Sequence, residues 1–482
     1  MEMSEPNAPS VSTSSETRVR GVAVVVFVAS FVTFAWFFQG SGENQNAHFS
    51  TVRALAEHHT FDITAYAAST RDTVARDGRI YSNKLPGLPL LGLLAYWPAQ
   101  LIERFLFHAD LDAARVRQFN HYLVTLLCSA VPAAITTVTM HHLFHREGMH
   151  LRSAALLALA FALGTLTFPF AGVLMVHNLV AMCIVLAWCL LTSAAPRGWK
   201  IALAGLLMGL AILADHLTLP VVVLLIAFLL WDRQPLRSVI SFVIGPLLGL
   251  GAVLWYRAAV LGHPFDTGVA DESGLFVEQH LLFGVLGVPD VRRVYWLSFN
   301  PFRGLFYCCP ITLLPLIGLF HARRKLLTPR LLIPLAIAAW YVLFNLSFNG
   351  WTGGVGVGPR YLIPALPMLF LFAPFAVLRH RLIAIGLSVL SMFIMFSVTA
   401  VRLMHPWANN VGPPLGEDPV ATSIERLLMG DVARNVESFN LGLAMGLPGR
   451  WSLVPPMIIV IMLLFLLQRL TSAPASVEEV SR

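Results

Sequence analysis

Long apolar runs separated by short polar ones dominate this chain. The first apolar run extends from about Gly21 to Phe38. Later windows near the ~20 residues that a helix needs to cross a membrane begin at about Leu85, Phe119, Arg152, Asn178, Trp199, Leu217, Ser238, Arg303, Pro329, Tyr361, Leu382 and Trp451. The pattern predicts an all-α integral membrane protein, a polytopic helical bundle of about 11–13 transmembrane helices.

The longest polar stretch near the start of the chain, residues 40–84, also has a pattern. His48, Thr51, Val52, Leu55 and Ala56 recur in it at helical spacing. Such a segment, outside an apolar span, indicates an amphipathic helix that lies along the membrane surface. We therefore expect a first loop with a juxtamembrane helix of its own.

The remaining polar stretches define the boundaries of one transmembrane domain. We expect that domain over residues 21–470, with two further long loops at 262–300 and 402–450. The flanking segments are interpreted as a disordered N-terminal tail, residues 1–20, and a C-terminal tail, residues 471–482.

Composition agrees with this class and excludes others. Of the 482 residues, 57% are hydrophobic and only 12% are charged, against about 25% charged in soluble domains. A soluble enzyme and a disordered chain are both excluded. The net charge of +7 comes mainly from short loops, so it indicates topology and not a nucleic-acid partner. Five cysteines lie in apolar stretches without metal-binding spacing and are expected to be core residues.

The distribution of basic residues predicts the orientation. Arg18 and Arg20 precede the first span, which places the N-terminus in the cytoplasm by the positive-inside rule. From Phe119 onward basic residues occupy alternate loops, which are then cytoplasmic: Arg146 and Arg152, Arg197 and Lys200, Arg233 and Arg237, 323–325, Arg379 and Arg381, and Arg469. By this count the segment from Leu85 to Phe105 is not a simple single crossing.

Ionisable residues at membrane depth are costly, so those that are retained are functional candidates. Several converge on the extracytoplasmic side in this topology. They are Glu43, Asp62, Lys84 and Arg360, together with two hairpin tips, one with His177 and Asn178 and the other with Asp215 and His216. A carboxylate among them has the chemistry of a general base, although Glu43 also suits a solvated loop and Asp62 a helix cap.

The cationic candidates suit an anion at headgroup depth. Lys84 precedes the prolines of LPGLP, and Arg360 ends the loop NGWTGGVGVGPR. Arginine offers a bidentate fork to phosphate, whereas lysine acts as a point charge. The glycines before Arg360 allow close approach of the backbone. The run is not a P-loop, because it lacks GK[ST]. Arg303 is a secondary candidate, and Trp351 and Tyr361 offer aromatic faces.

Four stretches carry a resemblance to a known family. They are GENQNAHFSTVRALAEHHTFDI, DGRIYSNKLPGLPLL, SFNPFRGLFYCCP and GWTGGVGVGPRYLIPALP, about a seventh of the chain. In order and spacing they resemble the GT-C glycosyltransferase superfamily, in particular its protein-mannosyltransferase and lipid A aminoarabinose-transferase branch. Within that branch, they resemble a largely uncharacterised group of bacterial membrane proteins.

The resemblance implies transfer of a sugar from a polyprenyl-phosphate donor, at the outer face of the bacterial inner membrane, to a lipid, glycan or protein acceptor. It implies a catalytic base in the first outer loop, Glu43 or its rival Asp62, and a phosphate contact at Lys84. Arg360, Tyr81 and Arg303 are grouped with Lys84 as donor-binding residues. The pocket residues are then His48, His177, Asn178, Asp215, His216, Trp351 and Tyr361. The family pattern carries an acidic pair where this chain has Glu43-Asn44, so the sequence does not support a divalent metal.

Two other classes of function remain open at this point. A secondary transporter or lipid flippase also uses many spans, but such proteins often show internal repeats. We find no convincing repeat, and the long outer loops favour a one-sided enzyme. A non-catalytic scaffold for envelope assembly is the third reading.

Overall fold

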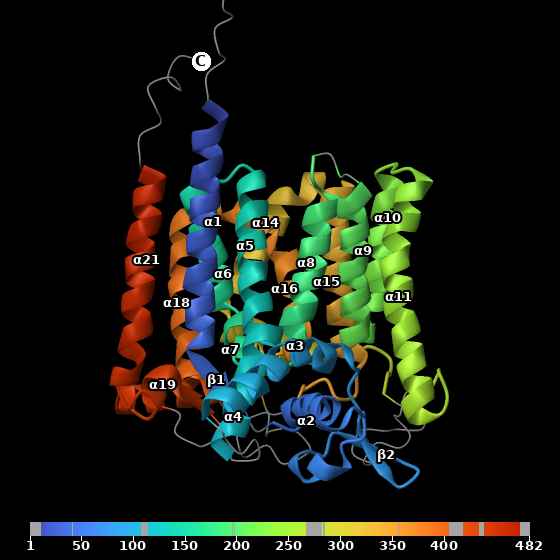
Figure 1. The fold of residues 1–482 in the computed structure, drawn as a ribbon. Helices are drawn as coiled ribbons and strands as arrows, with labels where there is room; N and C mark the ends of the chain where they lie inside the picture. The colour runs from blue at the N-terminus through green and yellow to red at the C-terminus, as the bar shows by residue number, and fades with distance from the viewer. Residues whose placement is uncertain are drawn as a thin grey trace, which may run out of the picture.

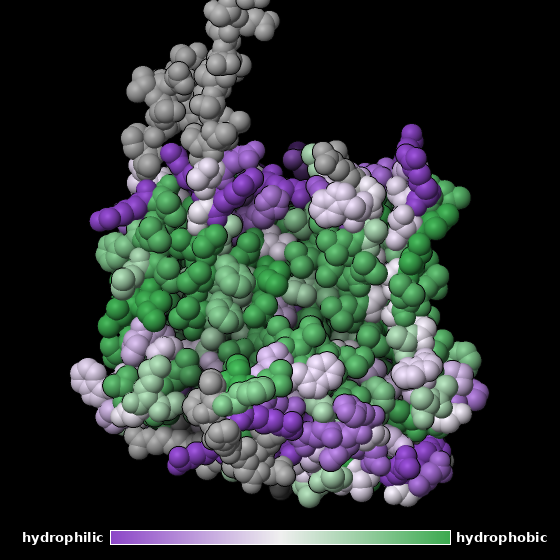
Figure 2. Space-filling view, in the orientation of Figure 1, coloured by the Kyte–Doolittle hydropathy of each residue, from purple (hydrophilic) through white to green (hydrophobic). Residues whose placement is uncertain are grey.

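The computed structural model describes residues 11–40, 42–107, 114–194, 196, 198–266, 282, 285–354, 356–403, 418–432 and 438–472. Upright helices form one layer, and shorter elements cover one end of it (Figure 1). The space-filling view shows a broad hydrophobic band between two hydrophilic ends (Figure 2). Six helices in the described ranges are long and apolar enough to cross a membrane, and five shorter apolar helices accompany them. The prediction of an all-α polytopic membrane protein is confirmed.

The upright helices of the first half run from the N-terminal segment to α11. They are α1 (Val11–Ala35), α4 (Ala114–Thr125), which continues through the π-helical turn η3 (Leu126–Ala130) into α5 (Val131–Arg146), α6 (Leu151–Gly164), α8 (His177–Leu191), α9 (Gly198–Ala214), α10 (Leu219–Trp231) and α11 (Leu236–Leu261). Helix α1 begins before the apolar run expected at Gly21, inside the segment that we interpreted as a tail. Short α7 (Thr167–Ala171) and η4 (His216–Thr218) connect neighbouring helices.

The second half completes the layer with shorter, proline-interrupted helices. These are α12 (Arg292–Ser298), α13 (Leu305–Cys308), η6 (Pro310–Thr312), α14 (Leu313–Ala322), η7 (Arg323–Lys325), α15 (Pro329–Ser347), η8 (Arg360–Ala365), α16 (Leu366–Phe370), α17 (Ala373–Val377), α18 (Arg381–Val401), α19 (Pro419–Met429), α20 (Leu441–Ala444), η9 (Gly449–Leu453) and α21 (Val454–Ser472). Prolines end or kink helices because they lack the N–H that the ladder needs.

The first loop folds as a small structure of its own at one end of the bundle, which we call the loop face. It contains α2 (Glu43–His58), η1 (Thr64–Ser69) and the strands β2 (Thr73–Arg76) and β3 (Arg79–Ser82). Figure 1 shows α2 lying across the ends of the upright helices. This agrees with the surface helix predicted from the spacing of His48 and its neighbours.

Helix α3 (Gly87–Ile102), followed by the π-helical η2 (Glu103–Phe107), resolves the difficulty in counting the crossings. It runs across the loop face (Figure 1) and is not among the candidate spans. Its first turn presses on α9, where a Cβ on Gly87 would lie 2.5 Å from the carbonyl carbon of Leu213. The segment after Lys84 therefore does not cross the membrane as a separate span.

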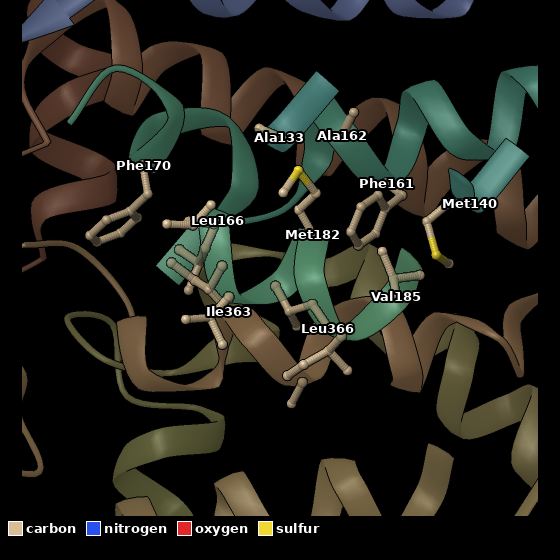
Figure 3. Packing of buried hydrophobic residues seen from close by; sticks show 14 of the residues in the cluster. Ala133, Met140, Phe161, Ala162, Leu166, Phe170, Met182, Val185, Ile363 and Leu366 are labelled. Atoms are coloured by element: carbon tan, nitrogen blue, oxygen red, sulfur yellow. The ribbon is translucent and has the colours of Figure 1, made fainter. Parts of the chain in front are cut away.

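Two kinds of contact hold the helices together. Side chains from the α6–α7 connection, α8 and the η8–α16 segment pack together in the core, where Leu166 lies beside Ile363 (Figure 3). Helices α9 and α11 instead meet through small residues, because a Cβ on Gly209 would collide with the carbonyl of Gly245. Close approach through small residues is a common packing mode between membrane helices.

Segments from the first and last parts of the chain pair at the loop face. Strand β1 (Phe37–Gln39) pairs antiparallel with β4 (Ser438–Asn440), with Phe38 opposite Phe439. Beside it, Trp36 Nε1 donates to the Ser452 carbonyl at 3.0 Å. The last residues of the expected first span are therefore strand and not helix. Parts of the loops expected at 262–300 and 402–450 lie outside the described residues.

Candidate active site

The hairpin of β2 and β3 brings a carboxylate onto the predicted lysine. Its two-residue turn, Asp77–Gly78, has φ of 52° and 74°, as a type I′ turn requires. Because Thr73 pairs with Ser82, the residues just outside the strands come together. Lys84 Nζ lies 2.9 Å from Asp72 Oδ2, with both side chains 24% exposed. The pair is half-buried and faces the ends of the upright helices.

Other ionisable groups surround this pair. Burial raises the pKa of Asp72, but the charges of Lys84, Arg360 and His48 outweigh it and hold that pKa below its usual range. Burial and the Lys84 charge lower the pKa of His48, on α2, to about 3. His48 is therefore neutral near pH 7, and its buried Nδ1 has no hydrogen-bond partner among the described residues.

Arg360 enters the same cluster from the other side. Its Nη1 lies 3.3 Å from Met175 Sδ, and its guanidinium lies 5.3 Å from the ring centre of Tyr361. Its buried Nε has no hydrogen-bond partner in the described part of the chain. The charges of Arg360, His48 and Lys84 all act on His177, so these groups share one site at the start of α8. The ring of His177 meets that of Tyr361 edge-on at 5.8 Å.

Arg303 holds the glycine-rich loop that carries Arg360. It is fully buried, and its guanidinium donates to the carbonyls of Gly354, Gly356 and Gly358. Positive φ at Gly353, Gly354 and Gly358 lets these carbonyls turn inward, which residues with side chains rarely allow. We expected Arg303 to contact phosphate, but the structure places it behind the loop as a positioning residue.

The structure thus gathers five of the predicted site residues: His48, Lys84, His177, Arg360 and Tyr361. The two predicted bases lie elsewhere. Glu43 begins α2 and pairs with Arg71 at 3.1 Å, with its side chain 45% exposed. Asp62 accepts from the Thr64 amide at 2.9 Å and faces Arg79. Both carboxylates complete the local structure of the loop.

The remaining predicted pocket residues, and the predicted donor-binding residue Tyr81, have structural partners. Asn178 Nδ2 donates to the Thr167 carbonyl at 3.2 Å. Asp215 caps η4 by accepting from the Leu217 amide at 3.0 Å, next to His216. Tyr81 packs with Phe61 against a small cluster of Val74, Tyr256, Val260 and Leu261. Trp351 stands 5.8 Å from the Arg293 guanidinium.

Asp72 is the residue that the sequence analysis missed. It stands in a polar stretch, RDTVARDGRI, where nothing in residue type distinguishes it from its neighbours. The signal that was available is Asp77–Gly78, because a DG pair between two short strand patterns predicts a two-residue hairpin turn. Counting outward from that turn places Asp72 beside the segment of Lys84.

An apolar groove lies among the helices near the site. One cavity of about 760 Å³ lies among α10, α11 and α15, and a second of about 680 Å³ adjoins it at Trp340 and Leu343. The second cavity extends to Phe344, whose ring lies 5.8 Å from that of Tyr361. The groove therefore reaches a residue that packs against Tyr361, the chain neighbour of Arg360. No group of three or more His, Cys, Asp or Glu side chains in the described ranges is placed to hold a metal ion.

Comparison with known proteins adds the fold family. No protein-family model matches the chain, and no curated protein matches it in sequence. Among solved structures, it is similar to ArnT from Cupriavidus metallidurans bound to undecaprenyl phosphate, with a TM-score of 0.50 and 16% identity over 95% of this chain and 78% of that one. Apo ArnT from the same organism matches with a TM-score of 0.49 and 17% identity, over 96% of this chain and 78% of that one.

A third likeness is to the Archaeoglobus fulgidus oligosaccharyltransferase tethered with an acceptor peptide. Its TM-score is 0.43 at 13% identity, over 92% of this chain and 55% of that one. At these identities the likeness concerns the fold alone. The evidence for the fold is the similarity to ArnT bound to undecaprenyl phosphate. This polytopic chain therefore shares its transmembrane fold with ArnT.

Proposed function

We propose that this protein is a membrane glycosyltransferase that takes its sugar from a polyprenyl-phosphate-linked donor. One observation carries the proposal: the cations Lys84 and Arg360 both act on the Asp72 carboxylate, and an apolar groove reaches Phe344, which packs against Tyr361 next to Arg360. A long prenyl chain with one phosphate has the same division into an apolar tail and an anionic head. The GT-C fold, and the undecaprenyl phosphate bound by ArnT of that fold, support the same donor.

In this proposal Arg360 and Lys84 bind the donor phosphate in different ways. The Arg360 Nε has no hydrogen-bond partner within the described ranges, and its guanidinium fork suits two phosphate oxygens. Lys84 is held by Asp72 at 2.9 Å, so it is already oriented before the donor arrives. A phosphate that binds Lys84 competes with Asp72 for its charge. Donor binding then releases the carboxylate for chemistry.

The released carboxylate of Asp72 is the base that we favour. It takes the proton of an acceptor hydroxyl while that oxygen attacks the anomeric carbon from the face opposite the phosphate. The new glycosidic bond forms as the bond from carbon to phosphate oxygen breaks, and polyprenyl phosphate leaves with the electron pair. Lys84 and Arg360 stabilise the charge that develops on the leaving phosphate, often the largest contribution in such sites.

The two histidines shape this site without adding charge. His48 is neutral near pH 7 because its pKa is about 3, so it offers hydrogen bonds instead of a further cation. The ring of His177 stands beside Tyr361. Glu43 and Asp62 remain the rival bases named from the sequence. Their pairing with Arg71 and Arg79 is the reason that we place Asp72 first.

The orientation follows from the basic residues. Arg18, Arg20 and Arg469 belong to the ends of α1 and α21 opposite the loop face (Figure 1). By the positive-inside rule that end is cytoplasmic and the loop face is extracytoplasmic. We therefore propose that transfer takes place on the outer side of a bacterial inner membrane, to a lipid, glycan or protein acceptor.

The test uses purified protein in lipid, with labelled donors that carry different sugars on polyprenyl phosphate. We expect Lys84→Ala and Arg360→Ala to weaken binding of polyprenyl phosphate itself. Asp72→Asn should bind donor but lose about 10²–10⁴-fold in turnover, the usual contribution of a general base. Lys200→Ala, a cation at the opposite face, is the matched control and should change neither quantity.

The rival assignments give different results in the same experiment. If Glu43→Gln or Asp62→Asn abolishes turnover while Asp72→Asn does not, the base is assigned wrongly but the transferase stands. If wild-type protein neither binds polyprenyl phosphate nor shows a response to Lys84→Ala, the proposal fails. Uptake of a solute by sealed vesicles would then favour the transporter alternative.

A further inference from the structure

A further cavity opens at the loop face, on the far side of α2 from His48. It measures about 370 Å³ and lies between α2, η1 and the start of α4. Asn46, Ser50 and Arg53 line it from α2, whereas His48 projects from the opposite side of the same helix, since residues four apart share a face and residues two apart do not. The cavity falls within the size range of sites for small ligands, and none of the groups assigned above to the donor lines it.

The lining combines aromatic faces with hydrogen-bonding groups. Phe38, Phe49 and Tyr66 supply rings, and Asn46, Ser50, Ser69 and Gln118 supply amides and hydroxyls. Two guanidinium groups, Arg53 and Arg117, line it, and Arg53 is paired with Glu57 at 3.0 Å. Rings beside polar groups suit the two kinds of surface of a sugar, and Arg117 suits an acidic group on it.

His121 provides an independent sign that a ligand is missing. Its side chain is only 7% exposed, and its ring stacks on Phe49 with centres 4.3 Å apart and planes 7° apart. The stacking fixes the ring, yet its buried Nε2 has no hydrogen-bond partner among the described residues. Buried polar atoms are rarely left unsatisfied in folded proteins, and His121 lines this cavity.

A short stretch of chain connects the cavity to the reaction site. Ser69 faces the cavity, where its Oγ lies 3.1 Å from Ser50 Oγ. The chain then passes the first turn of α2, where Thr70 donates to the Glu43 carbonyl at 2.7 Å, and reaches Asp72. Three residues span at most about 11 Å. A ligand in the cavity is therefore within the length of one or two sugar units of the Asp72 carboxylate.

We infer that this cavity binds the acceptor, as a saccharide that carries an acidic group such as phosphate. The inference rests on the proposed function, because Asp72 is taken as the place of transfer. The acceptor saccharide lies against the rings of Phe49 and Tyr66, with its acidic group toward Arg117 and a hydroxyl toward His121. Its reactive end extends along residues 69–72 to the donor. Donor and acceptor thus approach Asp72 from opposite sides of α2.

The cavity can be filled from its rim without disturbing the core. Ala65 and Ala68 line it and are exposed, so Ala65→Trp and Ala68→Trp place a ring in the opening. Ala75, an exposed alanine on β2 outside the cavity, gives the matched control Ala75→Trp. The probes are soluble oligosaccharides, neutral and phosphorylated, whose binding to detergent-purified full-length protein is measured by calorimetry.

We expect a phosphorylated oligosaccharide to bind wild type and Ala75→Trp alike, with affinity at least tenfold weaker in Ala68→Trp. Arg117→Gln should weaken binding of the phosphorylated probe and leave any binding of its neutral counterpart unchanged. The inference is overturned if wild type binds no phosphorylated saccharide, if the tryptophan at Ala68 has no effect, or if neutral probes bind equally well. Binding of polyprenyl phosphate, measured in parallel, should be unchanged in Ala68→Trp, so failure here is distinct from failure of the proposed donor site.

Discussion

The first loop contains two half-buried ion pairs, Lys84–Asp72 and Arg53–Glu57, and their surroundings differ. Arg53 meets Glu57 at 3.0 Å within one turn of α2. The hydroxyls of Tyr66 and Tyr96 donate to the same carboxylate at 2.6 and 2.5 Å, and Arg53 also stacks 4.2 Å from the centre of the Tyr66 ring. Every oxygen of Glu57 is engaged, so this network is complete in itself.

The Lys84–Asp72 pair is arranged in the opposite way. It joins two charges through a hairpin, and the neighbouring polar groups are left unsatisfied, with His48 Nδ1 and Arg360 Nε buried and unpaired among the described residues. Excess positive charge around one carboxylate favours a missing anion. The comparison teaches that an ion pair alone does not mark a site. Incomplete hydrogen bonding around it does.

The largest expected effect separates function from stability at the open pair. Replacing both members with apolar residues, Lys84→Met with Asp72→Leu, should reduce transfer by at least about 10²-fold, because phosphate binding and the base are both removed. Apolar replacement of a whole buried pair is often neutral for stability. Thermal unfolding in detergent should therefore be almost unchanged, and a collapse of folding would show that this pair is structural.

The closed pair should respond in the reverse sense. Arg53→Met leaves the Glu57 carboxylate without its cation, which costs about 1–3 kcal/mol when a buried charged group loses its partner. A clear fall in the unfolding temperature is expected, with turnover per folded molecule changed only a few-fold. The milder Tyr96→Phe should cost about 1 kcal/mol. Equal stability of wild type and Arg53→Met would contradict the contrast.

A smaller effect is expected from the loop that supports Arg360. Arg303→Lys keeps the charge but loses the planar fork that serves the carbonyls of Gly354, Gly356 and Gly358. Polyprenyl phosphate affinity should fall about tenfold, the equivalent of one hydrogen bond, while turnover at saturating donor changes less. Arg324→Lys at the opposite face is the control. A loss of turnover without a loss of polyprenyl phosphate affinity would instead indicate that Arg303 contacts the reacting atoms.

The smallest expected effect is the pH dependence near neutrality. The pKa of Asp72 is lowered, so its ionised form is present above the usual Asp value of about 3.9 and is lost only as pH falls through the still lower value of the folded protein. His48, with a pKa of about 3, also keeps its neutral form near pH 7. Between about pH 5 and 7 neither group should alter transfer. A change in the transfer rate near pH 6.5 that the His48→Asn variant abolishes would contradict this assignment.

Much of the fold followed from the sequence because membrane insertion is a local requirement. Apolar runs of sufficient length predicted the helices, and the spacing around His48 predicted α2. Lys84 and Arg360 were found because a charge at the end of an apolar segment is conspicuous by itself. The helical interpretation of Trp36–Phe38 failed because pairing with β4, some 400 residues away, outweighs the local preference.

The site required information that a linear pattern lacks. Asp72, Glu43 and Asp62 are similar carboxylates in one polar loop, and their roles differ through register and partners: Thr73 opposite Ser82 delivers Asp72 to Lys84, while Arg71 and Arg79 engage the other two. Likewise Arg303 has the composition of a phosphate ligand, yet burial commits it to backbone carbonyls. The sequence determined which segments enter the membrane, because transfer free energy depends on local composition. Only the tertiary structure decided which charges meet, because Coulomb and hydrogen-bond energies depend on distances between segments remote in the chain.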